Sequence, residues 1–251
     1  MEGGRDVTDK HHTARRKRKL TAADGVRAGI PIAVGYLPIA VAFGLLARSA
    51  GVAAEIAILM SLLVFAGASQ FVGINLLALG TVYGEIVLTT FLLNLRHFLM
   101  SASLAPRLEE GTGRIWRACL SFGITDETFT VASLRDEQEL SPQFLAALNA
   151  TAFVAWNAGT WAGLFLAEEL PAALKVSMGI ALYAMFVGLL VPAVKKSRQA
   201  LVVAMTAMAV NGLLQTVPAV AGLSAGWCIV IATLAGAVMG ACLFRQKGEE
   251  S

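Results

Sequence analysis

Long apolar runs follow one another almost without interruption from Gly25 to Phe244. The hydrocarbon core of a bilayer, ~30 Å thick, is crossed by about 20 helical residues, and about eight runs reach that length. The pattern predicts an all-α fold, a polytopic bundle of transmembrane helices. The expected spans are residues 26–48, 55–80, 85–104, 115–134, 143–167, 172–194, 199–221 and 225–244.

Composition excludes an ordinary soluble domain. Hydrophobic residues make up 57% of the 251 residues and charged residues only 15%, against ~25% charged in soluble proteins. We therefore expect one membrane transport domain at 25–244, a basic cytoplasmic tail at 1–24 and a short cytoplasmic tail at 245–251. The three cysteines form no C-x-x-C pair and lie in apolar runs, so neither a disulfide framework nor a metal site is predicted.

The distribution of lysine and arginine sets the expected orientation, because cytoplasmic loops of membrane proteins are enriched in both. Both termini are predicted to be cytoplasmic, and the protein is expected in the cytoplasmic membrane. The loop with Arg107, Arg114 and Arg117 would then lie outside, against the rule, and a re-entrant segment near residues 60–75 would be another way to resolve this. The basic side chains assigned to the cytoplasm are Lys10, Arg15, Arg16, Lys17, Arg18, Lys19, Arg135, Lys195, Lys196, Arg198, Arg245 and Lys247.

The basic N-terminal stretch is open to two other interpretations. It could bind nucleic-acid phosphates, but it directly precedes a membrane segment, where a positive-inside anchor explains it better. A cleaved signal peptide is disfavoured, because the following apolar run is too long and contains Pro31 and Pro38. No nucleic-acid partner is therefore expected.

Three charged residues, Arg96, Asp126 and Glu127, lie well inside predicted spans. Each costs ~2.5–3.5 kcal/mol to insert at the centre of a membrane helix, so something must offset the cost. An ion pair from Arg96 to Asp126 or Glu127 across neighbouring helices is the expected arrangement. It would either fix helix packing alone or place at least one carboxylate in a transport pathway.

The span around Arg96 has a polar face. Thr90, Asn94, His97 and Ser101 are spaced so that they share one side of a helix. Arg96 lies about 100° around the helix from His97 and can address another neighbour. His97 could relay protons or be a structurally satisfied histidine, and both interpretations stay open.

Several spans carry signs of broken helices or of polar linings. Pro31 and Pro38 are expected to interrupt the first span. The stretch 66–70 could be unwound, with backbone N–H groups that bind an anion, or could pack closely through Gly67 and Ala68. The fifth span has polar residues that line a pore or hydrogen-bond across helices. These are Asn149, Thr151, Trp156, Asn157, Thr160 and Trp161, while Gly159/Gly163 and Gly236/Gly240 form small-x-x-x-small pairs that favour helix association.

Four of these motifs together resemble the AzlC family of branched-chain amino acid permeases, over roughly residues 20–240. They are Gly29-Ile30-Pro31 with Gly35-Tyr36-Leu37-Pro38 and Phe43-Gly44, then Phe65-Ala66-Gly67-Ala68-Ser69-Gln70-Phe71, then Asn94-Leu95-Arg96-His97, and then Thr125-Asp126-Glu127. The resemblance implies a transporter, usually an exporter, of branched-chain and related hydrophobic amino acids, with a small membrane subunit of the AzlD type as partner.

No G-x-x-x-x-G-K-[ST] motif is present, so an ion or substrate gradient is expected to supply the energy. No enzyme activity, cofactor or metal is expected. The backbone around Gly67 to Gln70, with or without Arg96, would receive the substrate carboxylate, and Asp126 or Glu127 its ammonium group or a coupled proton. The candidate pathway residues are Asp126, Glu127, Arg96, His97, Asn94, Gly67, Ser69, Gln70, Pro38 and Asn157.

Three other functions are alternatives to transport. An ion channel would need a ring of like charges or a carbonyl filter, whereas the charges here are mixed in sign. A membrane-embedded serine hydrolase would use Ser69 with His97, although Gln70 stands where such enzymes have glycine. A scaffold without transport would not need to retain three costly charges.

Overall fold

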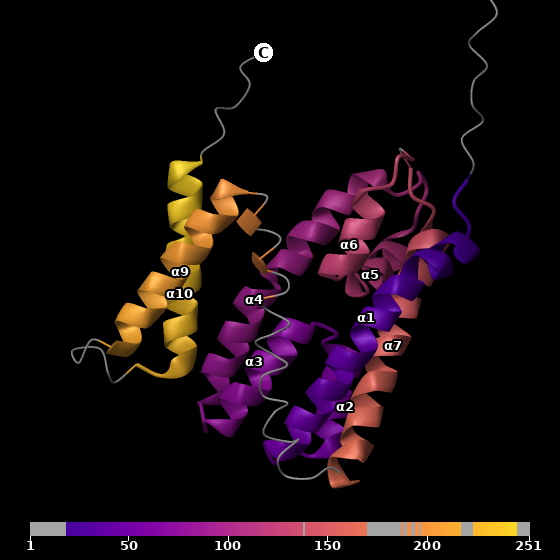
Figure 1. Cartoon of the computed structure of the whole chain (residues 1–251). Helices are drawn as coiled ribbons and strands as arrows, with labels where there is room; N and C mark the ends of the chain where they lie inside the picture. The colour runs from indigo at the N-terminus through magenta and orange to yellow at the C-terminus, as the bar shows by residue number, and fades with distance from the viewer. Residues whose placement is uncertain are drawn as a thin grey trace, which may run out of the picture.

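The computed structural model describes residues 19–137, 139–169, 187, 190–191, 194–195, 197–216 and 223–244. Within this part of the chain all regular elements are helical (Figure 1), apart from one isolated bridge between Leu108 and Leu140, and the all-α prediction is confirmed. The helices are α1 Ala22–Ser49, α2 Ala54–Leu63, α3 Gly67–Ala78, α4 Tyr83–Leu104, the 3-10 helix η1 Ala105–Arg107, α5 Arg114–Phe122, α6 Asp126–Ser133, α7 Pro142–Glu169, α9 Arg198–Thr216 and α10 Ala225–Leu243.

Four of the described helical segments are long and apolar enough to cross a membrane: α1, α4 with η1, α9 and α10. α7 is as long as α1 but carries polar side chains such as Asn149 and Asn157. The prediction of a multi-pass membrane protein is confirmed. The span expected at 172–194 lies almost wholly outside the described residues.

Residues 55–80 do not form the single span that hydropathy predicts. α2 and α3 are separated at Val64–Ala66, where Phe65 has a φ of 46°, a backbone conformation that bulky residues rarely adopt. The Gln70 side-chain amide donates to Ser61 Oγ (3.0 Å), which ties the first turn of α3 to the last turn of α2. The chain therefore reverses, and α3 returns to the end of the molecule from which α2 started (Figure 1). The re-entrant alternative near residues 60–75 describes this segment better.

Residues 115–134 also form a helical hairpin and not one span. α5 runs antiparallel to α4, because Ser101 Oγ donates to the Ser121 carbonyl (3.5 Å) while His97 Nδ1 lies 2.8 Å from the Ile124 carbonyl. α6 then turns back beside the C-terminal end of α4. The two hairpins, α2–α3 and α5–α6, enter from opposite ends of the molecule (Figure 1), and both reverse near its middle.

Arg107, at the end of η1, closes the second hairpin. Its guanidinium donates to backbone carbonyls at and just beyond the C-terminus of α6. A cation is favoured at this end of a helix, where the last carbonyls lack intrahelical donors. The accepting carbonyls belong to Ala132 (3.3 Å), Ser133 (2.9 Å), Arg135 (2.8 Å) and Glu137 (2.8 Å).

α1 and α7 pack along most of their length (Figure 1). Close approach needs small residues: a Cβ on Gly159 would lie 2.6 Å from Ala40 Cβ, and one on Gly163 would overlap the Val41 carbonyl. The expected role of Gly159/Gly163 in helix association is confirmed within the chain. α1 stays helical through Pro31 and Pro38, so the predicted interruption of the first span is wrong.

α9 and α10 form a separate pair that joins the rest of the molecule through α4. A Cβ on Gly240 would lie 2.7 Å from Val203 Cγ2, which confirms the second small-residue pair. The Glu85 carboxylate of α4 caps the N-terminus of α10, because it accepts hydrogen bonds from the Ser224 hydroxyl and from the Trp227 N–H (2.8 Å). A carboxylate is favoured at a helix N-terminus, so Glu85 fastens this pair to the body.

Candidate substrate site between the two hairpins

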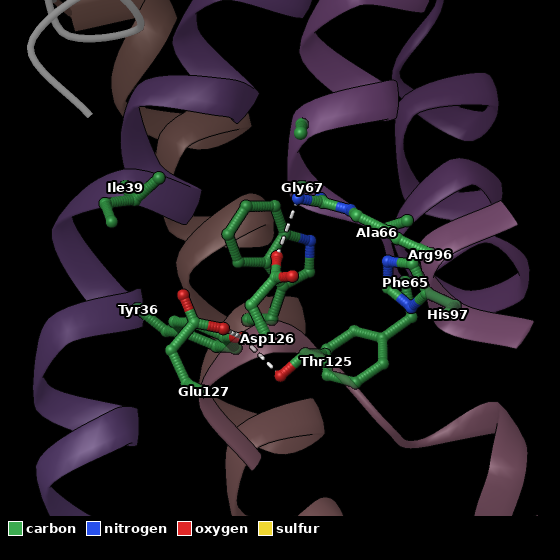
Figure 2. Close-up of a pocket in the computed structure, with 12 residues that line it drawn as sticks. Tyr36, Ile39, Phe65, Ala66, Gly67, Arg96, His97, Thr125, Asp126 and Glu127 are labelled. Carbon is green, nitrogen blue, oxygen red and sulfur yellow. Dashed lines mark hydrogen bonds and ion pairs between the residues drawn. The ribbon is translucent and has the colours of Figure 1, made fainter. Parts of the chain in front are cut away.

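A small pocket of about 40 Å³ lies where the tips of the two hairpins meet α1, α4 and α7 (Figure 2). One water needs roughly 10–15 Å³ of such space, so this conformation holds a few waters and not a whole amino acid. The lining combines aromatic and charged side chains with exposed backbone. The lining residues are Tyr36, Ile39, Phe65, Ala66, Gly67, Ala68, Arg96, His97, Thr125, Asp126, Glu127 and Trp156.

The expected ion pair is present: Arg96 Nη1 lies 2.9 Å from Asp126 Oδ2, across α4 and α6 (Figure 2). Both side chains remain more than a third exposed (39% and 37%), so the pair is not sealed inside protein. Such a pair contributes less to stability than a fully buried one. Its position at the pocket matters more than its strength.

Glu127 has a different environment. Its carboxylate accepts a hydrogen bond from the Tyr36 hydroxyl of α1, which also lies 2.7 Å from Thr125 Oγ1. No ion pair found among the described residues includes Glu127. The formal charges of Arg96, Asp126 and Glu127 sum to −1, and Glu127 has no cationic partner in the part of the chain that the structure describes.

The N-terminus of α6 is satisfied by its own side chains. Thr125 Oγ1 accepts from the Thr128 N–H (3.3 Å) and Thr128 Oγ1 accepts from the Thr125 N–H (2.8 Å), which is a reciprocal capping box. Asp126 and Glu127 follow in the first turn, where the helix dipole favours negative charge. The cap thus starts α6 at the position that presents both carboxylates to the pocket.

The N-terminus of α3 also reaches the pocket, but no side chain caps it. The Gln70 amide oxygen takes the N–H of Ala66 (3.2 Å), the residue before the helix. The backbone of Gly67 and Ala68, in the first turn, lines the pocket. Uncapped N–H groups at a helix N-terminus form a favourable site for an anion.

His97 holds the turn of the second hairpin. Because a carbonyl oxygen only accepts, the contact with the Ile124 carbonyl assigns the ring proton to Nδ1. Nε2 is buried and has no partner among the described residues. His97 thus fixes the chain just before Thr125 and Asp126 while lining the pocket itself.

The structure divides the sequence-predicted residues into two groups. Asp126, Glu127, Arg96, His97 and Gly67 line the pocket. Five others lie outside its lining: Ser69, Gln70, Pro38, Asn94 and Asn157.

Ser69 and Gln70 are buried behind the pocket and stabilise the first hairpin. Ser69 Oγ donates to the Ala66 carbonyl (3.0 Å). Gln70 bonds Ser61 Oγ, which in turn lies 2.8 Å from Thr160 Oγ1 on α7. Ser69 is only 1% exposed and its hydroxyl is used, so it is not presented as a nucleophile. This geometry does not support a serine hydrolase.

The remaining three residues have other surroundings. Pro38 is exposed on α1, and Asn157 Nδ2 donates to the Phe153 carbonyl of its own helix. Asn94 Oδ1 is buried and has no hydrogen-bond partner among the described residues. No role was predicted for Tyr36 or Thr125, although both line the pocket, and Trp156 was named only among the residues that line a pore or hydrogen-bond across helices. Tyr36 and Thr125 stand inside motifs of the family resemblance, and that position was the available signal.

The family model for "AzlC protein" matches residues 31–170, and every residue that lines the pocket falls within that stretch. The chain belongs to the AzlC family. It is 30% identical over 230 residues, 89% of both chains, to "Inner membrane protein YgaZ" of Escherichia coli K12. It is 36% identical to an "Uncharacterized membrane protein" of Archaeoglobus fulgidus, over 68% of this chain and 75% of the relative.

A further AzlC relative bears a functional name. "Branched-chain amino acid transport protein AzlC" of Bacillus subtilis is 33% identical over 102 residues, 41% of this chain and 39% of the relative. No solved structure matches the chain.

Proposed function

We propose that this AzlC-family protein is a secondary transporter that exports branched-chain or other hydrophobic amino acids across the cytoplasmic membrane. The observation that carries the proposal is the pocket between the two hairpins, which offers both signs of charge beside apolar walls. The name of the Bacillus subtilis relative supports the same substrate class. Discontinuous helices that meet at a central site recur in secondary transporters.

The pocket suits a zwitterion with an apolar side chain. Asp126 is already balanced by Arg96, so Glu127 is the carboxylate left to receive the substrate ammonium. The first turn of α3 would receive the substrate carboxylate. Ile39 and Phe65 supply apolar contacts for the side chain.

Substrate entry requires a movement, because the pocket is too small for a whole amino acid. The two hairpins enter from opposite ends of the molecule, so displacement of one would open the pocket to one side of the membrane only. The bond between Tyr36 and Glu127 joins α1 to the second hairpin and must break when that hairpin moves. Binding of the substrate ammonium by Glu127 would compete with this bond.

The hairpins also change the proposed topology. With α2–α3 and α5–α6 re-entrant and one crossing at 172–194, about six crossings remain, and both termini stay cytoplasmic. Arg107, Arg114 and Arg117 then move to the cytoplasmic side, as the positive-inside rule requires. Lys19 Nζ lies 3.1 Å from Glu109 Oε2, which places the start of α1 beside that loop.

The topology is tested by cysteine accessibility. In a variant without Cys119, Cys228 and Cys242, we expect Thr112→Cys in intact cells to resist an impermeant maleimide and to react after the membrane is opened. Ser49→Cys, at an exposed position at the other end of α1, serves as the matched control. Labelling of residue 112 in intact cells would restore the original eight-span arrangement.

The transport proposal is tested by intracellular accumulation of valine, leucine, isoleucine and methionine during dipeptide feeding, with and without this chain. Glu127→Gln should lower export at least ~10-fold, because a lost charged hydrogen bond is worth about 1.5–3 kcal/mol. Glu55→Gln, an exposed carboxyl in the first turn of α2, is the control. Normal export in Glu127→Gln and Asp126→Asn, at normal protein levels, would remove both carboxylates from the mechanism.

A small membrane subunit of the AzlD type is part of the proposal. It rests on the family resemblance. Co-expression with the subunit encoded nearby should raise export above that of this chain alone, and co-purification checks the complex directly.

A further inference from the structure

The side chain of Trp156, on α7, contains a buried donor with no use in the fold. Trp156 is only 3% exposed, and its indole Nε1 has no hydrogen-bond partner among the described residues. An indole N–H can only donate, and a buried donor without an acceptor is costly. Because Trp156 lines the pocket between the hairpins, a ligand there can supply the missing acceptor.

The neighbours of the indole keep it in place. The Tyr36 ring meets it edge-on at 5.4 Å between centroids, and the Phe43 ring stacks on it at 6.3 Å. Aromatic pairs at these separations are mutually stabilising. The indole therefore cannot easily turn to find another acceptor, and its N–H stays buried and without a partner among the described residues.

Trp156 also packs directly on the uncapped start of α3. A Cβ added to Gly67 would lie 2.7 Å from Trp156 Cη2, so the first residue of α3 rests on the edge of the indole. The free backbone N–H groups of that first turn and the indole N–H thus belong to one wall of the pocket. Two kinds of donor thus lie on separate helices beside the same pocket, and neither has a hydrogen-bond partner among the described residues.

We infer that the Trp156 indole N–H and the first turn of α3 together bind the carboxylate of the transported amino acid. The inference rests on the proposed function and names the group that this part of the pocket recognises. A monoanion fits better than a phosphate, because Glu127 leaves the pocket with an unbalanced negative charge and the remaining wall is aromatic. A planar carboxylate accepts from both donors at once.

The test uses purified full-length protein and two ligands that differ in one group. L-valine carries both the carboxylate and the ammonium, whereas isobutylamine keeps the ammonium and side chain and lacks the carboxylate. Trp156→Phe keeps an aromatic ring but removes the N–H together with part of the bicyclic ring, and isobutylamine binding controls for the lost volume. We expect Trp156→Phe to weaken valine binding about 10-fold or more, as for a lost hydrogen bond to a charged group, and to leave isobutylamine binding unchanged. Trp161→Phe, an exposed tryptophan on the same helix, is the matched control.

Each outcome bears on the inference. Equal valine affinity in Trp156→Phe and wild type would overturn it, and so would equal weakening of both ligands, which indicates packing and not a hydrogen bond. A further test needs no mutation: the wild-type protein must bind valine more tightly than isobutylamine and than L-valinamide. Absence of binding and transport for every branched-chain amino acid would instead overturn the proposed function itself.

Discussion

Each of the two hairpins brings a helix N-terminus to the same pocket, but only one of these N-termini has a side-chain cap. In α5–α6 the N-terminus of α6 is closed by the Thr125–Thr128 capping box, and the first turn presents Asp126 and Glu127. In α2–α3 the N-terminus of α3 has no side-chain cap, and its first turn presents glycine and alanine. One hairpin offers acidic side chains, and the other offers backbone donors.

The difference shows how one architecture yields two opposite binding ends. A capped helix start satisfies its own N–H groups, so the carboxylates beside it are not used as the cap. Asp126 pairs with Arg96, which leaves Glu127 for an external cation. An uncapped start leaves N–H groups for an external anion. Interactions away from the pocket stabilise each hairpin: Gln70 bonds Ser61 in the first, and Arg107 bonds the C-terminal end of α6 in the second.

The largest effect is expected from filling the uncapped tip. Gly67→Ala places a methyl group against Trp156, whose ring is held by Tyr36 and Phe43 and cannot retreat. Displacing the start of α3 should reduce export on the order of 100-fold, as for misplaced substrate-positioning groups. Gly73→Ala on the same helix is the control, because its Cβ would meet the flexible end of Met60 at 3.4 Å. Comparable export in the two variants would show that the first hairpin tip is not part of the path.

The second largest effect is expected at the far end of the other hairpin. Arg107→Ala leaves carbonyls of the α6 C-terminus without their donor, which should cost on the order of 2–4 kcal/mol for hydrogen bonds from a charged group. The Tm of the detergent-solubilised protein reports the loss. Arg114→Ala, at an exposed position in the first turn of α5, should leave the Tm unchanged. Equal Tm values in both variants would contradict the proposed stabilisation of α5–α6.

A smaller effect is expected from the buried amide of the first hairpin. Gln70→Leu removes the acceptor of the Ala66 N–H and a donor to Ser61, which should cost about 1–3 kcal/mol for groups left unpaired. Asn75→Leu is the matched control, because the Asn75 amide bonds only the Phe71 carbonyl of its own helix. A larger Tm loss in Asn75→Leu than in Gln70→Leu would argue against the buried network.

The smallest effect tests the capping box. Thr128→Val keeps the shape of the side chain and deletes the oxygen that accepts from the Thr125 N–H, for an expected loss of about 1 kcal/mol. Thr130→Val, whose hydroxyl bonds the Asp126 carbonyl within the helix, is the control. Thermal unfolding should give Thr128→Val a lower Tm than Thr130→Val. A lower Tm in Thr130→Val would contradict the capping role.

Part of this site could be predicted from sequence, because charges in apolar runs are costly and therefore conspicuous. Arg96, Asp126 and Glu127 stood out for that reason, and the pairing of Arg96 with a carboxylate of a neighbouring helix was expected because it offsets the cost of insertion. The glycine pairs of α7 and α10 also packed as predicted, since small residues at helical spacing permit close approach.

The α5–α6 hairpin was not predicted and the α2–α3 hairpin was only an alternative near residues 60–75, because hydropathy measures apolar length and not direction. The first reversal occurs at Phe65, a bulky residue whose positive φ has no signal in the sequence, whereas Pro31 and Pro38 signalled breaks that α1 does not make. The second reversal did have a local signal, since Thr125 stands three residues before Thr128 at a helix start. Its effect on topology became evident only from the contacts of α5 and α6 with α4.

The described residues that line the pocket all lie between Tyr36 and Trp156, and α9 and α10 supply none of them. The C-terminal pair is fastened to the body mainly by the Glu85 carboxylate on α4. The residues that select the ligand and the helices α9 and α10 therefore lie in separate parts of the chain. A chimera in which everything after α7 comes from a relative should keep the ligand preference of the protein that supplies its N-terminal part, provided that an acidic residue remains at position 85.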